Sequence, residues 1–325
     1  MKLRNPDFSI NPINKEHSEL GLPPIEAAVA HPGSHPVLSL LAWLATFMLV
    51  AAVGYLVLRL FNFTGSLGSA EALVLDTLQS ELFWSAVAVG VLAQTIDGAL
   101  GMAYGITSTT FLLASGVSPA VATASVHIAE VFTTGVSGLA HVKLKNVNHK
   151  LFFRLLFPGL TGAIGGAFLV SSIDGDVLKP FISVYLLIMG IYLVSKVFRH
   201  YKPVYTEPRH VAKLALFGGF VDAVGGGGWG PVVTTTLVSS GHDPRTTIGS
   251  VNFAEFFLTF GAAIAFSLLV EDGPWPIVTG LVLGGVLAAP LAALLTRKFQ
   301  AKTLLVLVGV LISLVSAVNL FNTFN

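Results

Sequence analysis

Asp222-Ala-Val-Gly-Gly-Gly-Gly-Trp-Gly-Pro231 is the stretch that decides the fold, because it places four consecutive glycines between long apolar segments. A weaker version, Asp97-Gly-Ala-Leu-Gly-Met-Ala-Tyr-Gly105, lies 125 residues earlier. The apolar segments that follow, 104–115 and 230–240, are shorter than the roughly 20 residues that cross a bilayer as a helix. Because glycine is unfavourable inside a helix, we expect each run to break a membrane segment into two half-helices.

The composition of the chain indicates a membrane protein. Of its 325 residues, 54% are hydrophobic and 11% are charged, less than half of the roughly 25% charged residues of ordinary soluble domains. The formal net charge of +1 leaves no basic field for nucleic acid, and the absence of cysteine excludes disulfides and thiolate chemistry. The sequence therefore predicts an all-α integral membrane protein.

The two glycine runs belong to an internal duplication. Residues 97–136 align without a gap to residues 222–261, and the match resumes further on at three pairs of glycines. Shared apolar composition does not place polar and turn residues in register. The pairs that carry the duplication are Asp97 with Asp222, Pro119 with Pro244, Glu130 with Glu255, Gly165-Gly166 with Gly284-Gly285, and Gly190 with Gly309.

Basic and acidic loops alternate along the chain, and cytoplasmic loops carry the excess of Lys and Arg. The loop after the third segment is basic in the first copy, at 143–150, and acidic in the second, at 271–272. We therefore expect repeats of inverted topology, with seven full crossings and two re-entrant hairpins. The expected organisation is a polar cytoplasmic tail at 1–36, an extra N-terminal transmembrane helix at 37–63, an extracytoplasmic linker at 64–81, repeat 1 at 82–198, a basic cytoplasmic junction at 199–209 and repeat 2 at 210–325.

Inverted repeats with broken helices are typical of secondary transporters, whose sites lie at the repeat interface near the midplane. The glycine runs, together with the Gly-x-x-Pro turns at Gly116 and Gly241, resemble the sulfite exporter TauE/SafE family over about residues 80–322. The resemblance implies a permease of a bacterial inner membrane that exports a small sulfur-containing anion such as sulfite, sulfoacetate or another organosulfonate. It implies neither enzymatic activity nor a cofactor.

The glycine breaks also predict an anion site on physical grounds. The first N–H groups of a helix lack partners within that helix, and they carry the positive end of its dipole. Glycine lets the backbone approach a ligand closely, and nearby threonines offer neutral hydroxyl donors. In the alternative interpretation the glycines only permit tight helix packing, as expected at Gly162/Gly166 and Gly280/Gly284, and the aromatic residues pack in the core. The predicted substrate-binding residues are Gly101, Tyr104, Gly105, Thr107, Thr109, Gly226, Gly227, Gly228, Trp229, Gly230 and Thr234.

Several ionisable residues fall inside apolar helices, where such groups usually need a functional reason. Glu130 shares a helix face with His127, and Asn252 and Glu255 repeat this pair in the second copy. A carboxyl group in low dielectric binds a proton more readily, which suits proton coupling. In the alternatives, the glutamates are hydrogen-bonded structural groups or cation ligands, and the aspartates cap loop amides. The predicted coupling or gating residues are Asp97, His127, Glu130, Asp222, Asn252 and Glu255.

Two other functions are alternatives to anion transport. A cation transporter would use the intramembrane carboxylates as ligands, against the positive ends of two half-helices. A membrane-embedded enzyme would need a nucleophile beside a base, and Ser125 and His127 point in different directions from their helix. No His, Asp or Glu spacing matches a metal site, so no metal is expected. The expected partners are the anion and the lipid bilayer.

Overall fold

The computed structural model describes residues 35–60, 75–100, 102–198, 210–240, 244–270, 275–295 and 301–324, and these residues form helices joined by turns. The predicted all-α architecture is confirmed for this part of the chain. The expected tail up to residue 34, most of the linker at 64–81 and the junction at 199–209 lie outside the described residues, as does the acidic pair at 271–272.

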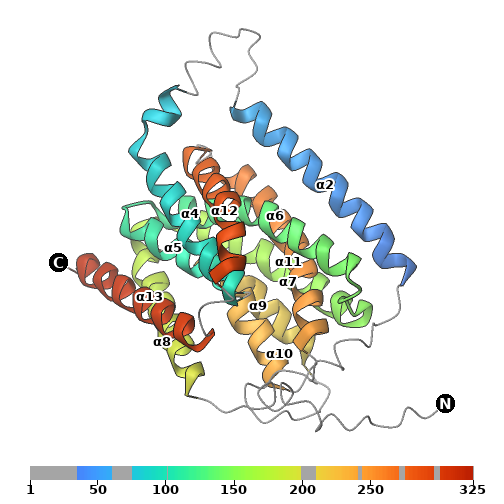
Figure 1. Ribbon diagram of the computed structural model, residues 1–325. Coiled ribbons are helices and arrows are strands. Elements are labelled where there is room, and N and C mark those ends of the chain that lie inside the picture. Colours follow the sequence, from blue (N-terminus) through green and yellow to red (C-terminus); the bar gives the residue numbers. More distant parts are fainter. Residues whose placement is uncertain are drawn as a thin grey trace.

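Helices follow one another in the same order in the two halves of the chain (Figure 1). Each half begins with a helix that ends at a glycine run, and a short second helix starts after the break. The first half contains α4 (Glu81–Leu100), α5 (Tyr104–Ala114), α6 (Pro119–Lys143), α7 (His149–Ser172) and α8 (Gly175–Val197). The second half contains α9 (Val211–Gly225), the π-helical turn η3 (Trp229–Thr234) that continues into α10 (Thr235–Ser239), α11 (Pro244–Leu269), α12 (Trp275–Leu295) and α13 (Ala301–Phe324).

Five of the described helices are long and apolar enough to cross a membrane. One of them is α2 (Pro36–Leu60), which lies at the side of the bundle next to α6. The five spans are Pro36–Leu58, His149–Ser172, Gly175–Lys196, Thr246–Leu269 and Val306–Thr323. The chain is therefore a multi-pass helical membrane protein, and the finer arrangement of seven crossings and two hairpins stays a prediction.

Glycines bring two pairs of helices into backbone contact. A Cβ on Gly166 of α7 would come within 2.5 Å of the carbonyl oxygen of Phe220 on α9, and one on Gly162 would collide with the carbonyl oxygen of Leu216. Small residues at this spacing allow membrane helices to approach closely. The packing role expected for these glycines is confirmed, and it recurs where Gly280 and Gly284 of α12 meet the backbone of Phe83 and Val87 on α4.

Corresponding helices of the two halves also contact each other. The hydroxyl oxygens of Thr134 on α6 and Thr259 on α11, which are equivalent positions, lie 3.4 Å apart. Further along, Asn252 Nδ2 donates to Ser137 Oγ over 3.2 Å, so residue numbers rise along α6 as they fall along α11. The two helices therefore run antiparallel. In the same way α8 packs on α13, where a Cβ on Gly190 would come within 2.8 Å of the carbonyl oxygen of its equivalent, Gly309.

Replacing Gly162 by alanine should destabilise the bundle, because the new methyl group forces α7 away from the α9 backbone. Overpacking of this kind costs about 1–3 kcal/mol. Gly165→Ala is the matched control, since a Cβ on Gly165 meets nothing within 4 Å. In detergent micelles, thermal unfolding should show a clear loss of stability for the Gly162 variant only. Equal stability of both variants would contradict the close α7–α9 contact.

Candidate functional site

A cavity of about 270 Å³ lies where the two helix breaks meet. Its walls come from α4, α5 and α6 of the first half and from α9, η3 and α11 of the second. The cavity therefore lies between the two copies of the duplicated unit. The sequence-predicted residues that line it are Asp97, Tyr104, Gly105, Glu130, Asp222, Gly227, Gly228, Gly230, Asn252 and Glu255.

The two breaks cross in backbone contact. A Cβ on Gly105 would come within 2.7 Å of Gly227 Cα and within 2.9 Å of Glu130 Oε1. Gly226 and Gly227 have φ angles of 64° and 151°, which side-chain-bearing residues rarely adopt. In the first half Ala103 takes a positive φ of 93° at the start of α5. Glycine is thus required here both by the conformation of the second break and by the space at the crossing.

Both aspartates bind the amides that begin the following half-helix. Asp222 Oδ1 accepts hydrogen bonds from the N–H groups of Gly228, at 2.7 Å, and Trp229, at 2.9 Å. Asp97 Oδ1 accepts from the Tyr104 N–H at 3.2 Å. These amides have no partner within their own half-helix, as expected, and an aspartate of the preceding half-helix accepts from them, so the geometry shows the capping of loop amides that was the alternative for the aspartates. Each carboxylate lies where an anion would bind a helix N-terminus.

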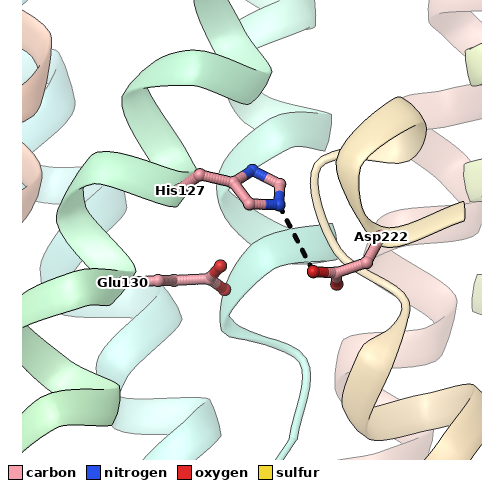
Figure 2. A group of neighbouring side chains, drawn as sticks. All are labelled: His127, Glu130 and Asp222. Carbon is pink, nitrogen blue, oxygen red and sulfur yellow. Dashed lines mark hydrogen bonds and ion pairs between the residues drawn. The ribbon is translucent and has the colours of Figure 1, made fainter. Parts of the chain in front are cut away.

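A buried imidazole connects this cap to α6. His127 Nε2 lies 3.3 Å from Asp222 Oδ2, and His127 Nδ1 lies 2.9 Å from the carbonyl oxygen of Thr123 (Figure 2). A carbonyl oxygen only accepts, so Nδ1 carries a proton and the Nε2 of a neutral ring would turn its lone pair toward the carboxylate. The contact is therefore a hydrogen bond only in a state in which a second proton lies between the ring and the carboxyl group.

Glu130 completes a group of three buried ionisable side chains. The three side chains converge (Figure 2). Each offers one potential ligand atom, and these atoms, from His127, Glu130 and Asp222, all lie within 4.8 Å of one another. Glu130 Oε2 is buried and has no hydrogen-bond partner among the described residues. One imidazole and two carboxylates are a donor set that also suits a cation. Sequence spacing did not indicate such a group, because helix packing brings the three residues together.

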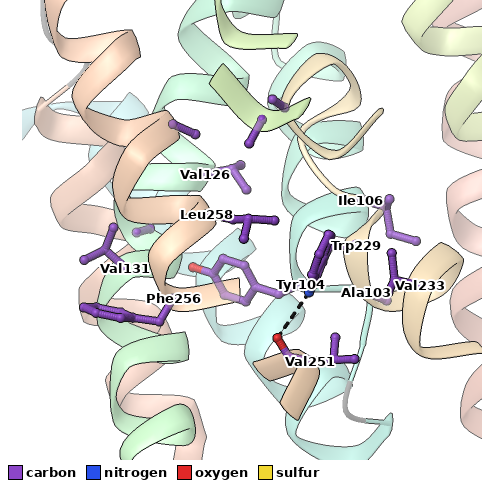
Figure 3. Packing of buried hydrophobic residues seen from close by; sticks show 14 of the residues in the cluster. Ala103, Tyr104, Ile106, Val126, Val131, Trp229, Val233, Val251, Phe256 and Leu258 are labelled. Atoms are coloured by element: carbon purple, nitrogen blue, oxygen red, sulfur yellow. Dashed lines mark hydrogen bonds between the residues drawn. The ribbon is translucent and has the colours of Figure 1, made fainter. Parts of the chain in front are cut away.

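The remaining predicted residues lie away from the cavity lining. Trp229 is fully buried in the apolar core, where its Nε1 donates to the Val251 carbonyl oxygen over 3.2 Å (Figure 3). The hydroxyl of Thr109 donates to the Gly226 carbonyl oxygen over 2.9 Å and so supports the break. Thr107 and Thr234 are buried, and Gly101 lies outside the described residues. Thr109 is therefore committed to the break, whereas Thr107 Oγ1 is buried without a hydrogen-bond partner among the described residues, and the donor role of Thr107 and Thr234 stays a prediction.

Sequence reasoning missed several residues near the cavity. Ser137 and His141 line it, and their helical spacing from Glu130 was a signal that would have found them. Tyr185 on α8 donates its hydroxyl to the Gly227 carbonyl oxygen over 2.8 Å. Lys196 Nζ lies 2.7 Å from Thr235 Oγ1 and 3.4 Å from the sulfur of Met102, a cavity-lining residue. At the offset that pairs Gly190 with Gly309, Tyr185 pairs with Leu304 and Lys196 with Val315, so the duplication gave no polar signal for either residue.

Asp222→Ala should destabilise the protein, because it leaves the buried N–H groups of Gly228 and Trp229 without their acceptor. An unsatisfied buried donor costs about 1–3 kcal/mol. Asp222→Asn keeps an oxygen at the same position and is the matched control. Thermal unfolding in detergent should place the Asn variant near the wild-type protein and the Ala variant well below it. A stable Ala variant would mean that the cap does not hold the break.

Comparison with known proteins agrees with this architecture. The chain matches the family model described as Sulfite exporter TauE/SafE over residues 86–320. It is 47% identical over 244 residues to the probable membrane transporter protein YtnM of Bacillus subtilis (strain 168), covering 72% of this chain and 81% of the relative. It is 21% identical over 257 residues to the probable membrane transporter protein YunE of the same organism, with 70% and 94% covered. No solved structure matches the chain. The chain therefore belongs to the sulfite exporter TauE/SafE family of membrane transporters.

Proposed function

We propose that the protein is a secondary transporter that exports a small sulfur-containing anion, such as sulfite, sulfoacetate or another organosulfonate, through the cavity between the two repeats. The observation that carries this proposal is the meeting of two half-helix N-termini, at Gly105 and Gly228, on the cavity wall. Helix N-termini favour anions, and transporters of this architecture use them at the membrane midplane. The family description, a sulfite exporter, supports the class of substrate and the direction.

We further propose that the repeats have inverted topology, with seven crossings and two re-entrant hairpins, and that α2 is an addition to them. Antiparallel packing of α6 on α11 supports the inversion, because equivalent helices related by a two-fold axis in the membrane plane run in opposite directions. Alternating access would then move one repeat against the other around the cavity.

In the proposed mechanism Asp222 is an internal competitor of the substrate. Its carboxylate already binds the Gly228 and Trp229 amides, so an incoming anion has to displace a negative charge from them. A proton shared between Asp222 and His127 removes this charge and links anion binding to proton binding. The other titratable groups that face this position or line the cavity are Asp97, Tyr104, Glu130, His141, Tyr185 and Glu255.

Cation transport is the second candidate, and the lining of the cavity favours it. Four carboxylates, those of Asp97, Glu130, Asp222 and Glu255, reach the cavity. In their ionised form they would attract a cation and repel sulfite. The two candidates therefore differ in the sign of the charge that the cavity tolerates.

Flux measurements on Ser137 variants in proteoliposomes test whether the cavity accepts an anion or a cation. Ser137 lines the cavity, and Asp at this position keeps an acceptor for Asn252 while adding a negative charge. At about 5 Å and an effective dielectric of about 20, like-charge repulsion is about 3 kcal/mol, or roughly a hundredfold in affinity. Ser137→Asp should therefore strongly reduce the flux of labelled sulfite or sulfoacetate, and Ser137→Asn should reduce it much less. Undiminished anion flux, or a gain in cation flux, would favour the cation carrier.

The matched glutamates should govern the pH dependence of transport. Wild-type anion flux should fall as pH rises, because lost protons leave negative charges in the cavity. Glu130→Gln and Glu255→Gln imitate the protonated side chains, and each should flatten this dependence. Glu81→Gln at the start of α4, which does not line the cavity, is the control and should leave the profile unchanged. Unaltered profiles in both cavity variants would assign these glutamates a structural role.

A further inference from the structure

The crossing of α2 and α6 leaves a groove that the transport site does not use. The helices touch near their middle, where Ala45 is fully buried and a Cβ on Gly135 would come within 3.1 Å of Leu49 Cδ1. On the side of this crossing toward the C-terminal end of α6, residues of both helices face a common space. The space between them there is a groove of about 340 Å³.

The groove is apolar along its length and basic at one end. Its floor is formed by Leu38, Ala42, Leu139 and Val142, and Lys143 and Lys145 stand where α6 ends. Both lysines are exposed, and no carboxylate is among the described residues that line the groove. At the same end, the ring of His35 stacks on that of His149 at 4.2 Å between centroids. This end of the groove is therefore complementary to an anion.

The length of the groove matches one leaflet of a bilayer. Its α2 side extends from His35 to Thr46, which is about 17 Å at 1.5 Å per residue. Half of a hydrocarbon core is about 15 Å. Trp43, 73% exposed on α2, lines the groove about 12 Å along the helix from His35, so it lies beside the apolar part of the groove.

We infer that this groove binds an anionic phospholipid, with the phosphate at Lys143 and Lys145 and an acyl chain along the apolar residues of α2 and α6 that line it. Basic pockets between membrane helices recognise lipid headgroups, and each nearby Lys or Arg contributes about 1 kcal/mol. The apolar floor excludes free phosphate as a sufficient ligand, because most of the groove would stay unfilled. The site is separate from the transport cavity and shares no lining residue with it.

Native mass spectrometry of the full chain in detergent tests this site with phosphatidylglycerol and with phosphatidylcholine of the same acyl chains. The wild-type protein should retain phosphatidylglycerol preferentially, and Lys143→Gln/Lys145→Gln should lower its apparent affinity roughly thirtyfold. Lys150→Gln/Lys213→Gln removes the same charge from exposed lysines outside the groove and should have little effect. Ala42→Trp, which fills the apolar floor and keeps both lysines, should also weaken binding. Equal retention of both lipids, or full retention by the lysine variant, would overturn the inference.

The same spectra distinguish two other occupants. The N-terminal segment carries Asp7, Glu16, Glu19 and Glu26 and precedes the groove directly. If neutralising these four residues in the full chain raised phosphatidylglycerol binding tenfold, the segment would occupy the groove of the wild-type protein, and the proposal that lipid fills it there would be wrong; unchanged binding supports the lipid. If the lysine variant lost a dimer rather than lipid, a second copy would fill the groove, which would also overturn the inference.

Discussion

The capped helix break is the feature on which the rest of the structure depends. Backbone that leaves the helical conformation at membrane depth must find partners inside the protein, because lipid offers none. Here Asp222 takes the amides of Gly228 and Trp229, and hydroxyls of Tyr185 and Thr109 donate to the carbonyl oxygens of Gly227 and Gly226. These partners come from three different helices, so the break holds its shape only while α5, α8 and α9 stay packed together.

The caps also place two negatively charged groups at the positions where an anion would bind. Two carboxylates at helix N-termini are locally stabilised by the helix dipole, and this stabilisation gives the aspartates a structural reason to be present. The same charges oppose the binding of an anion at those positions. The same amides bind the Asp222 carboxylate that stabilises the break and would have to bind the anion in the proposed transport. His127, which contacts Asp222, is placed to change the charge of this carboxylate by sharing a proton with it.

The sequence predicted the helical membrane class, the breaks and all four carboxylates that line the cavity, since these depend on local composition and on polar residues repeated in register. It did not predict which side of each half-helix faces the cavity. Tyr104 lines the cavity while its equivalent Trp229 is buried in the core, and only the packing of neighbouring helices decides this. The contact of His127 with Asp222 joins residues 95 positions apart through the packing of α6 near α9, and no local pattern encodes it.

The two breaks are anchored unequally, and this inequality has a consequence for a carrier with two accessible states. Asp222 holds two amides and Tyr185 adds a further bond to the second break, whereas Asp97 holds one amide beside Ala103 in a positive-φ conformation. In an inverted repeat of identical halves, the states open to either side of the membrane would have equal free energy. On the proposed inverted topology, unequal anchoring of the two breaks would give the two states different free energies, and the empty transporter would rest open mainly to one side of the membrane.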